Sequence, residues 1–551
     1  MTAAVVEPQR DAFVFAPEER PSFPGAPYTP PHPGWRRAGY ATIGLLSGVG
    51  SNLGNSLITV NISDIAGGLG LYVYQASLLP AFYVAFIASA NLILVRGRVQ
   101  FGIAASTQAA LTAYLVAGAI QLLFPGFPTA LLVRAAAGFA GAALVTFAIF
   151  NFMQIVRPKA RPVAVVLAIS STQLGQPLAR LFPVETLART HWHALHLVEL
   201  AIPLTLLAAS RLLPLPPSDR MRWLRRDDFA TFALVLVGML LACSVLAEGR
   251  LLWWTETPWL GVALALSVPC FALAILVERR RKRPALQLHW LGSVEILRFA
   301  AVALLVRLAL AEQTYGAVGL LTSGGLTNDQ LRLLFLMVAA AMALGSATAV
   351  LTLSEKSPRY QVMVAALLIA LGAWIDTDAT NVTRPPQLYL SQTLIAFGTT
   401  LFIGPALVLG FRKLFQQGAD YLVSFIFLFN STQNIGGLVG SALLGTYQVI
   451  CTRYHAATLS ERLLAGDPQV ATRIEAGRQA LAGSIVDPGM QAAQGSGLLA
   501  QALAREATIL AYNDVFRLVC LLALLTAAFV AAIILGSAAQ DRRARAHALP
   551  A

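Results

Sequence analysis

The chain has 551 residues, of which 57% are hydrophobic and only 12% are charged. A soluble domain carries about a quarter charged residues, so this composition excludes an ordinary soluble fold and predicts a protein surrounded by lipid. The formal net charge of +13 does not indicate a nucleic-acid partner, because the basic residues form short clusters between apolar blocks, where orientation in a bilayer explains them.

Residues 1–37 are polar and proline-rich, and we expect a disordered cytoplasmic tail without a cleavable signal peptide. Fourteen apolar blocks follow, each about as long as a membrane-spanning helix. They cover roughly 38–60, 73–95, 103–123, 130–155, 163–181, 193–213, 229–247, 258–277, 293–313, 333–353, 360–375, 388–411, 421–447 and 514–536. A barrel would show shorter, alternating segments, so the predicted fold class is an all-α membrane protein with 14 transmembrane helices.

Lysine and arginine gather in every second loop, as with Arg96 and Arg98 after the second block and Arg157 and Arg161 after the fourth. The short loops between them hold few basic residues. Because positive loops stay on the cytoplasmic side, we expect both termini in the cytoplasm.

The first block carries a polar stripe. Asn52, Asn55, Ser56 and Thr59 follow one another at i, i+3, i+4 and i+7, so they share one helix face. Such a stripe either lines a cavity or bonds a neighbouring helix. We expect it to line a substrate cavity.

Arg134 lies near the outer end of the fourth block and is followed by Gly138, where a second helix can approach closely. Its side chain either snorkels to the interface or forms a buried cation that a carboxylate or a substrate neutralises. Glu199, near mid-depth in the sixth block, is the best candidate for a protonatable carboxylate. The alternative is a neutral glutamic acid that bonds a neighbouring helix.

Pro177 in the fifth block predicts a helix kink, with Gln173 and Gln176 placed to bond across the kink or reach a substrate. In the ninth block, Arg307 and Glu312 are candidates for gating or proton coupling.

The twelfth and thirteenth blocks add amides and glycines. The amides, which we expect to line the cavity, are Gln392, Asn430, Gln433 and Asn434. The glycines, which predict a close-packing seam between helices, are Gly436, Gly437 and Gly440.

Residues 448–512 are a polar stretch on the predicted external side, with segments such as "PQVATRIEAGRQALAG" that have helical character. The stretch is either a poorly structured insertion or a docking element for a partner outside the membrane.

Enzyme motifs are absent from the sequence. It has no P-loop, no HExxH and no Cys/His cluster, and its four cysteines lack metal-ligand spacing. We expect no catalytic residue, no metal and no cofactor. Without a nucleotide-binding motif, any pumping has to be secondary.

The ordered motifs resemble those of the fourteen-span drug:proton antiporters of the major facilitator superfamily, the EmrB-like branch. The segment "LGNSLITVNISDIAGGLG", Leu53 to Gly70, is similar to the family's first-span pattern LDxTIVNVAxPxIxxxLG. Arg134 with Gly138, Pro177, and the run Gly436–Gly440 match the fourth, fifth and thirteenth spans. The resemblance covers about residues 38 to 536.

Four departures from the family stand out. The acidic residue of its first span is Gly54 here, and the loop "RGRVQFG" lacks the family's aspartate. The fifth-span segment "LGQPLARLF" has fewer glycines around its proline, and Gln433 stands where an arginine is common. The missing first-span carboxylate leaves Glu199 or Glu312 to take over proton binding, or leaves transport uncoupled.

The resemblance implies the major facilitator fold in a bacterial inner membrane, with a substrate bound at the midplane and alternating access. The implied division is a tail over 1–37, a six-helix bundle over 38–214, two extra helices with cytoplasmic linkers over 215–292, a second six-helix bundle over 293–536 including loop 448–512, and a cytoplasmic tail over 537–551.

We therefore expect export of a small organic compound, drug-like or aromatic, driven by protons. Alternatives are an uncoupled uniporter or exchanger, and a non-transporting scaffold or sensor. The expected partners are the small-molecule substrate, protons, membrane lipid and, through loop 448–512, a periplasmic adaptor with an outer-membrane channel.

Overall fold

The computed structural model describes residues 19–21, 25–182, 192–354, 357–417, 421–464 and 466–547. Over these residues the chain is helical, and the β-pairing is limited to an isolated bridge between Pro27 and Ser218. Long apolar runs form helices because a helix satisfies its own backbone hydrogen bonds where lipid offers none.

A first group of helices covers residues 34–212. It consists of α1 (Gly34–Val60), α2 (Ile62–Gly68), α3 (Val73–Ala76), α4 (Leu78–Phe101), α5 (Ile103–Leu123), α6 (Phe127–Met153), the short turn η2 (Pro158–Ala160), α7 (Arg161–Gln173), α8 (Gly175–Ala179) and α10 (Trp192–Leu212). Helix α6 is at its centre and contacts α1, α4, α5 and α7.

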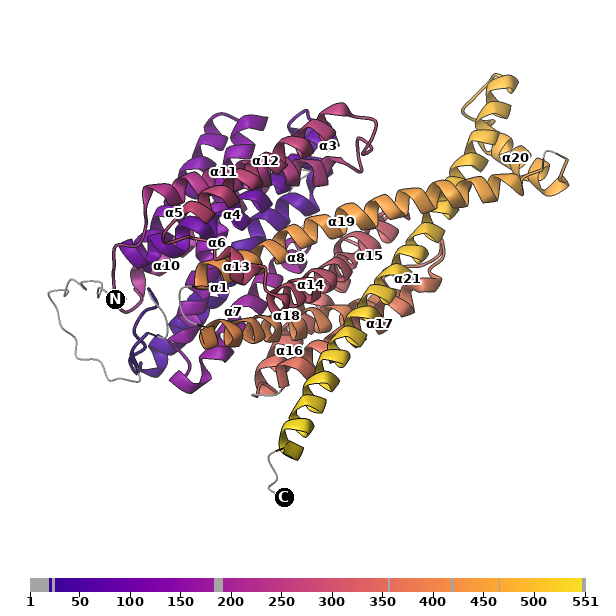
Figure 1. The fold of residues 1–551 in the computed structure, drawn as a ribbon. Helices are drawn as coiled ribbons and strands as arrows, with labels where there is room; N and C mark the ends of the chain where they lie inside the picture. Colours follow the sequence, from indigo (N-terminus) through magenta and orange to yellow (C-terminus); the bar gives the residue numbers. More distant parts are fainter. Residues whose placement is uncertain are drawn as a thin grey trace.

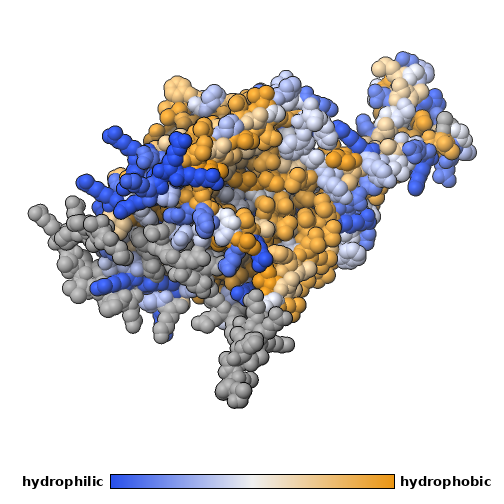
Figure 2. All heavy atoms as spheres, in the orientation of Figure 1, coloured by the Kyte–Doolittle hydropathy of each residue, from blue (hydrophilic) through white to orange (hydrophobic). Residues whose placement is uncertain are grey.

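Two further long helices, α11 (Arg226–Glu248) and α12 (Pro258–Arg280), form a pair that packs on α4. They are the least buried of the candidate membrane helices. Leucine and valine side chains stand out from α12, with Val268 62% exposed, as expected of a helix that faces lipid. Figure 2 shows such apolar side chains over much of the visible face.

A second group of helices follows a short connecting helix, α13 (Leu288–Leu291). It consists of α14 (Val294–Leu310), α15 (Glu312–Ser323), α16 (Arg332–Leu351), α17 (Ser357–Ile375), the turns η3 (Asp376–Asp378) and η4 (Pro385–Leu388), α18 (Tyr389–Gln417), α19 (Leu422–Glu461), α20 (Pro468–Leu481) and α21 (Pro488–His547). The first group contacts the second through α4 with α19 and through α7 with α16 and α18.

The two ends of the helices differ in charge. One end, called here the basic end, carries Arg96 and Arg98 near the end of α4, Arg157 after α6 and Arg161 at the start of α7. At the opposite end, α19 and α21 continue beyond their apolar parts and α20 packs against α21 (Figure 1). We call this extension, residues 448–512, the arm, and this end of the molecule the arm end. The polar loop expected at 448–512 is thus mostly helical.

Every predicted span overlaps a helix or a pair of helices. By length and composition, 11 helices in the described parts of the chain are suited to cross a membrane. The others are polar or interrupted: α1 carries the polar stripe, α7 has 13 residues before the break at Leu174, and α14 has 17 before the break at Ala311. The count of 14 spans stays a prediction.

The predicted disordered tail is wrong for its described part. Helix α1 already begins at Gly34, and the segment before it packs on the basic end: the Tyr28 amide donates to the Pro217 carbonyl at 3.0 Å, and Ala26 is 2% exposed. Residues 1–18 and 22–24 lie outside the described residues. Small apolar side chains that pack against the helix ends order this proline-rich stretch.

Candidate functional site

A buried ion pair lies in the arm-end half of the first group. Arg134 of α6 is 2% exposed and Glu199 of α10 is 1% exposed, and the arginine Nη2 donates to the glutamate Oε1. The Tyr114 hydroxyl on α5 donates to the same oxygen at 2.6 Å. The second guanidinium nitrogen of Arg134 lies 3.3 Å from the Gly54 carbonyl of α1. We call these residues, with His196, the Glu199 cluster.

Gly54 explains why the carboxylate comes from α10. A Cβ added at residue 54 would lie 2.6 Å from the Tyr114 hydroxyl and 3.4 Å from Glu199 Oε1. The space beside α1 where a first-span carboxylate would point is therefore already filled by Glu199 and Tyr114. The buried carboxylate nearest to residue 54 therefore comes from α10 rather than from α1.

The second oxygen of Glu199 is less well satisfied. His196 Nδ1 lies 3.5 Å from Glu199 Oε2, while the histidine Nε2 lies 3.0 Å from the Gly118 carbonyl. A cavity of about 30 Å³, lined in part by Gln121, Arg134, His196 and Glu199, adjoins this oxygen. A space of this size matches about one water molecule's share of liquid volume, so one water fits beside Glu199.

A central cavity of about 60 Å³ lies between the two groups of helices. It brings together six predicted residues from four helices: Asn52, Gln173, Arg307, Asn430, Gln433 and Asn434. Tyr83 also lines it, and the Tyr83 hydroxyl donates to the Ser51 carbonyl at 2.5 Å. Amides, a hydroxyl and one guanidinium thus face one small space at the contact between the groups.

Arg307 of α14 reaches this cavity because the residues of α19 opposite it are glycines, which have no side chain. Its Nε donates to the Gln433 carbonyl at 2.8 Å. A Cβ at Gly436 would lie 3.0 Å from Arg307 Cγ, and one at Gly437 would lie 2.9 Å from Arg307 Nη2. The predicted glycine seam therefore makes room for an arginine side chain as well as for a helix.

Other predicted packing residues lie at close helix contacts. A Cβ at Gly138 of α6 would lie 2.5 Å from the Tyr83 carbonyl of α4, and one at Gly440 of α19 would lie 2.7 Å from Ala311 Cβ. Pro177 is buried in α8, just after the break between α7 and α8. Glycine at these positions sets the distance between neighbouring helices.

Five predicted cavity residues, Gln392 among them, lie outside the lining of the central cavity. Ser56 is buried in α1, and Gln176 is half-buried on α8. Thr59 is exposed and donates to the Asn55 carbonyl at 2.9 Å. Asn55 Oδ1 is buried without a hydrogen-bond partner among the described atoms. Of the four residues in the polar stripe of α1, only Asn52 lines the central cavity.

The sequence predicts that Gln392 lines the central cavity, but Gln392 lies elsewhere. It lies at the arm end of the second group, where its Nε2 is 3.2 Å from Glu312 Oε1 and 2.9 Å from Asp376 Oδ2. Both carboxylates are buried, at 0% and 2% exposure. Helix α18 begins at this end, so its first turn meets the break between α14 and α15 and the end of α17.

Sequence reasoning missed Tyr114 and Asp376. A tyrosine inside an apolar block gives no signal of its own, because aromatic side chains are common in membrane helices. Asp376 directly follows the predicted end of the eleventh span and was counted as loop, whereas it is buried beside Gln392. The signal was present in "WIDTD", where a carboxylate follows an apolar run without a turn residue.

Comparisons with known proteins identify the fold. No protein-family model matches the chain, and no curated protein matches it. The human organic anion transporter MFSD10 (TETRAN) has a similar structure, with a TM-score of 0.51 and 14% identity over 89% of this chain and 100% of that chain.

Two similar structures come from work on peptide transporters. One is a bacterial homologue of the human drug peptide transporters PepT1 and PepT2, with a TM-score of 0.55 and 12% identity over 92% of this chain and 99% of that chain. The other is from a study of proton-dependent oligopeptide transporters, with a TM-score of 0.55 and 13% identity over 90% and 98%. At these identities the likeness shows the fold alone, and this chain, a multi-pass membrane protein, shares that fold with these solved transporters.

Proposed function

We propose that the protein is a secondary active transporter that exports a small organic compound, drug-like or aromatic, by proton antiport with alternating access. The observation that carries the proposal is the Glu199 cluster, a buried carboxylate paired with Arg134 beside a water-sized space. Buried ionisable residues at membrane depth mark ion and proton pathways. The fold shared with solved transporters supports the transporter class.

Protonation of Glu199 links proton binding to helix movement. It removes the negative charge that neutralises Arg134, and a buried arginine without a counter-charge is unfavourable. Arg134 also contacts the Gly54 carbonyl on α1, and α1 carries Asn52 into the central cavity. A change in the ion pair therefore acts on a helix that lines the proposed substrate path, which is the coupling that an antiporter needs.

Orientation follows from charge. The basic end would face the cytoplasm and the arm end the external side, because positively charged loops stay on the cytoplasmic side. Substrate would enter between the two groups at the basic end and leave at the arm end after the groups rock.

The test uses the purified protein in liposomes, with a pH dye in the lumen and an imposed proton gradient. Substrate-dependent proton movement is expected for the native chain and is expected to fall to background in Glu199→Gln. The matched control is Glu248→Gln, because Glu248 is also a buried glutamate, 2% exposed, but lies on α11 outside both groups. Equal proton movement in native protein and Glu199→Gln contradicts the proposal.

One observation favours uncoupled transport as a second candidate. Arg134 already neutralises Glu199, and Gly54 supplies no further carboxylate to the cluster. A uniporter or exchanger would move substrate down its own gradient in Glu199→Gln at the native rate, with no proton movement in either protein. The same liposomes, assayed with labelled substrate, separate the two candidates.

A further inference from the structure

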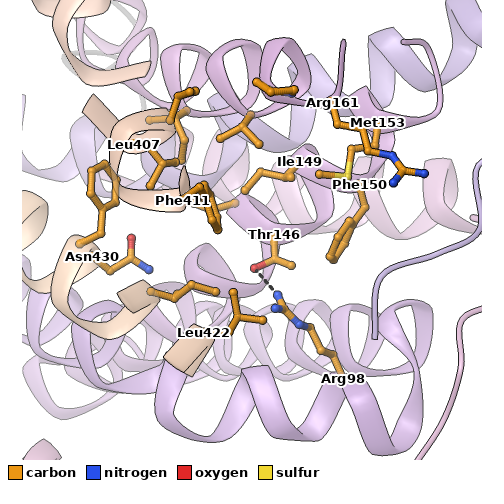
Figure 3. A pocket seen from close by; sticks show the side chains of 17 residues that line it. Arg98, Thr146, Ile149, Phe150, Met153, Arg161, Leu407, Phe411, Leu422 and Asn430 are labelled. Atoms are coloured by element: carbon orange, nitrogen blue, oxygen red, sulfur yellow. Dashed lines mark hydrogen bonds between the residues drawn. The ribbon is translucent and has the colours of Figure 1, made fainter. Parts of the chain in front are cut away.

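An apolar cavity between the two groups lies at the basic end (Figure 3). It has a volume of about 170 Å³ and is formed by α4, α6 and α7 of the first group and by α18 and α19 of the second. Its walls are almost wholly apolar and include Ile149, Phe150, Leu407 and Phe411. We call it the basic-end cavity.

Arg98 is one of the few polar residues in these walls, with Thr146, Arg161 and Asn430. It comes from the last turn of α4, is 5% exposed and lines the cavity. Its Nη1 donates to the Thr146 hydroxyl at 3.2 Å, and its guanidinium carbon lies 5.4 Å from the Phe150 ring centroid. Its Nε has no hydrogen-bond partner among the described atoms.

Arg98 differs from Arg96, two residues earlier. Arg96 pairs with Asp228 at 2.5 Å, whereas within the described side chains no carboxylate lies within ion-pair distance of Arg98. A buried cation without a counter-charge is costly, and buried charges are normally paired. The cavity therefore has an unmatched positive charge at one wall and room for a ligand beside it.

The size of the cavity limits the ligand. An apolar cavity of about 150 Å³ holds benzene, so the basic-end cavity accommodates one aromatic ring among its apolar side chains. The guanidinium of Arg98 presents parallel N–H donors that match a carboxylate. Arg161, which also lines the cavity, adds a second positive charge near the first turn of α7.

We propose that the basic-end cavity binds a single-ring aromatic carboxylate, with its carboxylate on Arg98 and its ring between α6 and α18. The inference rests on the proposed function, because it makes this cavity the cytoplasmic loading site of the exporter. Since both groups contribute walls, the ligand bridges the surfaces that have to separate during transport.

The test measures equilibrium binding of labelled benzoate to the purified full chain in detergent, without any gradient. Benzoate is expected to bind saturably, and benzamide, a neutral molecule of the same shape, is expected to compete at least about tenfold more weakly, since it lacks the charge-assisted bond. Arg98→Gln is expected to weaken benzoate binding about tenfold or more, and Arg98→Lys to retain part of it.

Two further variants separate the site from a folding defect. Ile149→Phe fills the cavity while Arg98 stays in place, and it is expected to abolish benzoate binding without lowering the unfolding temperature. Arg250→Gln is the control, because Arg250 stacks on Tyr315 away from this cavity and is expected to bind benzoate like the native chain. Equal competition by benzamide, native affinity in Arg98→Gln, or no binding to folded native protein overturns the inference.

The two proposals fail separately. If benzoate binding depends on Arg98 but substrate drives no proton movement in liposomes, the binding site is upheld and the proton antiport is contradicted. If the protein transports other compounds with protons but does not bind benzoate, the antiport is upheld and the binding site is overturned.

Discussion

Gly54 of α1 borders the Glu199 cluster. Gly54→Asp would put a second carboxylate beside Glu199 and force its side chain against the Tyr114 hydroxyl, 2.6 Å from the Cβ position. Two carboxylates would then compete for Arg134, and proton-coupled transport in liposomes is expected to fall at least about tenfold.

The double variant Gly54→Asp with Glu199→Gln tests whether the two positions share one role. It returns the cluster to one carboxylate, and we expect it to recover part of the proton movement that each single variant loses. Native transport in Gly54→Asp alone would show that residue 54 does not contact the coupling site.

Asp228 offers a second test, this time of stability. It pairs with Arg96 at 2.5 Å and also with Arg281, which in turn pairs with Glu278 at 2.5 Å. Asp228→Asn would leave two buried guanidinium groups with less counter-charge. We expect a loss of about 3 kcal/mol, measured as a lower unfolding temperature in detergent.

Asp219→Asn is the matched control for this substitution. Asp219 is exposed and accepts a hydrogen bond from the Tyr28 hydroxyl at 2.9 Å, so its replacement is expected to change stability by no more than about 0.5 kcal/mol. Equal unfolding temperatures for the two variants would mean that the buried ion cluster adds nothing to stability. Asp228 also supplies to Arg96 the carboxylate that the loop "RGRVQFG" lacks.

At the scale of elements, the contact between α14 and α19 depends on small residues. A Cβ at Gly440 would lie 2.7 Å from Ala311 Cβ and 3.2 Å from Leu308 Cα. Gly440→Leu is expected to push these helices apart and to destabilise the protein by about 1–3 kcal/mol. The control is Gly261→Leu on α12, where nothing lies within 4 Å of the added Cβ. Equal unfolding temperatures of the two variants would contradict the close packing of α14 on α19.

The arm has the features of a docking element. It exposes large apolar side chains, with Tyr454 at 67%, Leu464 at 67% and Val486 at 94%. We propose that it binds a periplasmic adaptor. Val486→Asp and Leu464→Asp together are expected to abolish co-purification with an adaptor and to leave liposome transport intact. Lost liposome transport would instead place the arm in the transport cycle.

Helices were the most predictable elements. The predicted third span, 103–123, has the same bounds as α5, and the eighth begins where α12 begins, at Pro258. Length and apolarity decide these ranges, and both are local properties of the sequence. Local patterns do not reveal that α19 and α21 run on into the arm, because polar helices outside the membrane lose the hydropathy signal that marks a span.

At the scale of the whole molecule, the sites were less predictable than the helices. Glu199 and Arg134 stood out separately as ionisable residues in apolar blocks, but their pairing across α6 and α10 is a property of packing. The same holds for Gln392, whose amide meets two carboxylates rather than the central cavity. Arg98 was interpreted as a loop charge, and only the fold shows that α6, α7, α18 and α19 enclose a cavity beside it.

Alternating access requires that the two groups separate at the arm end, where a hydrogen bond now joins them. Arg180, which follows α8 in the first group, donates to Asn328 Oδ1 at 2.7 Å and lies over the Phe335 ring of α16 at 4.9 Å. Cysteines at 180 and 328, in a chain whose native cysteines are replaced by alanine, allow these groups to be joined by a flexible thiol crosslinker. The joined protein is expected to lose at least about 90% of transport, and reduction of a cleavable linker to restore it, because rocking is needed to release substrate.

A crosslink inside one group controls for the chemistry. Asn381 Nδ2 and Glu506 Oε1 lie 2.5 Å apart within the second group, so cysteines there, joined in the same way, are expected to leave transport unchanged. Loss of transport in both crosslinked chains would point to damage from the reagent. Full transport by the 180–328 crosslinked chain would mean that the arm end does not open between α8 and α16, and substrate would then have to leave by another route through the bundle. The measurement thus decides whether the fold shared with solved transporters also moves by separating its two groups here.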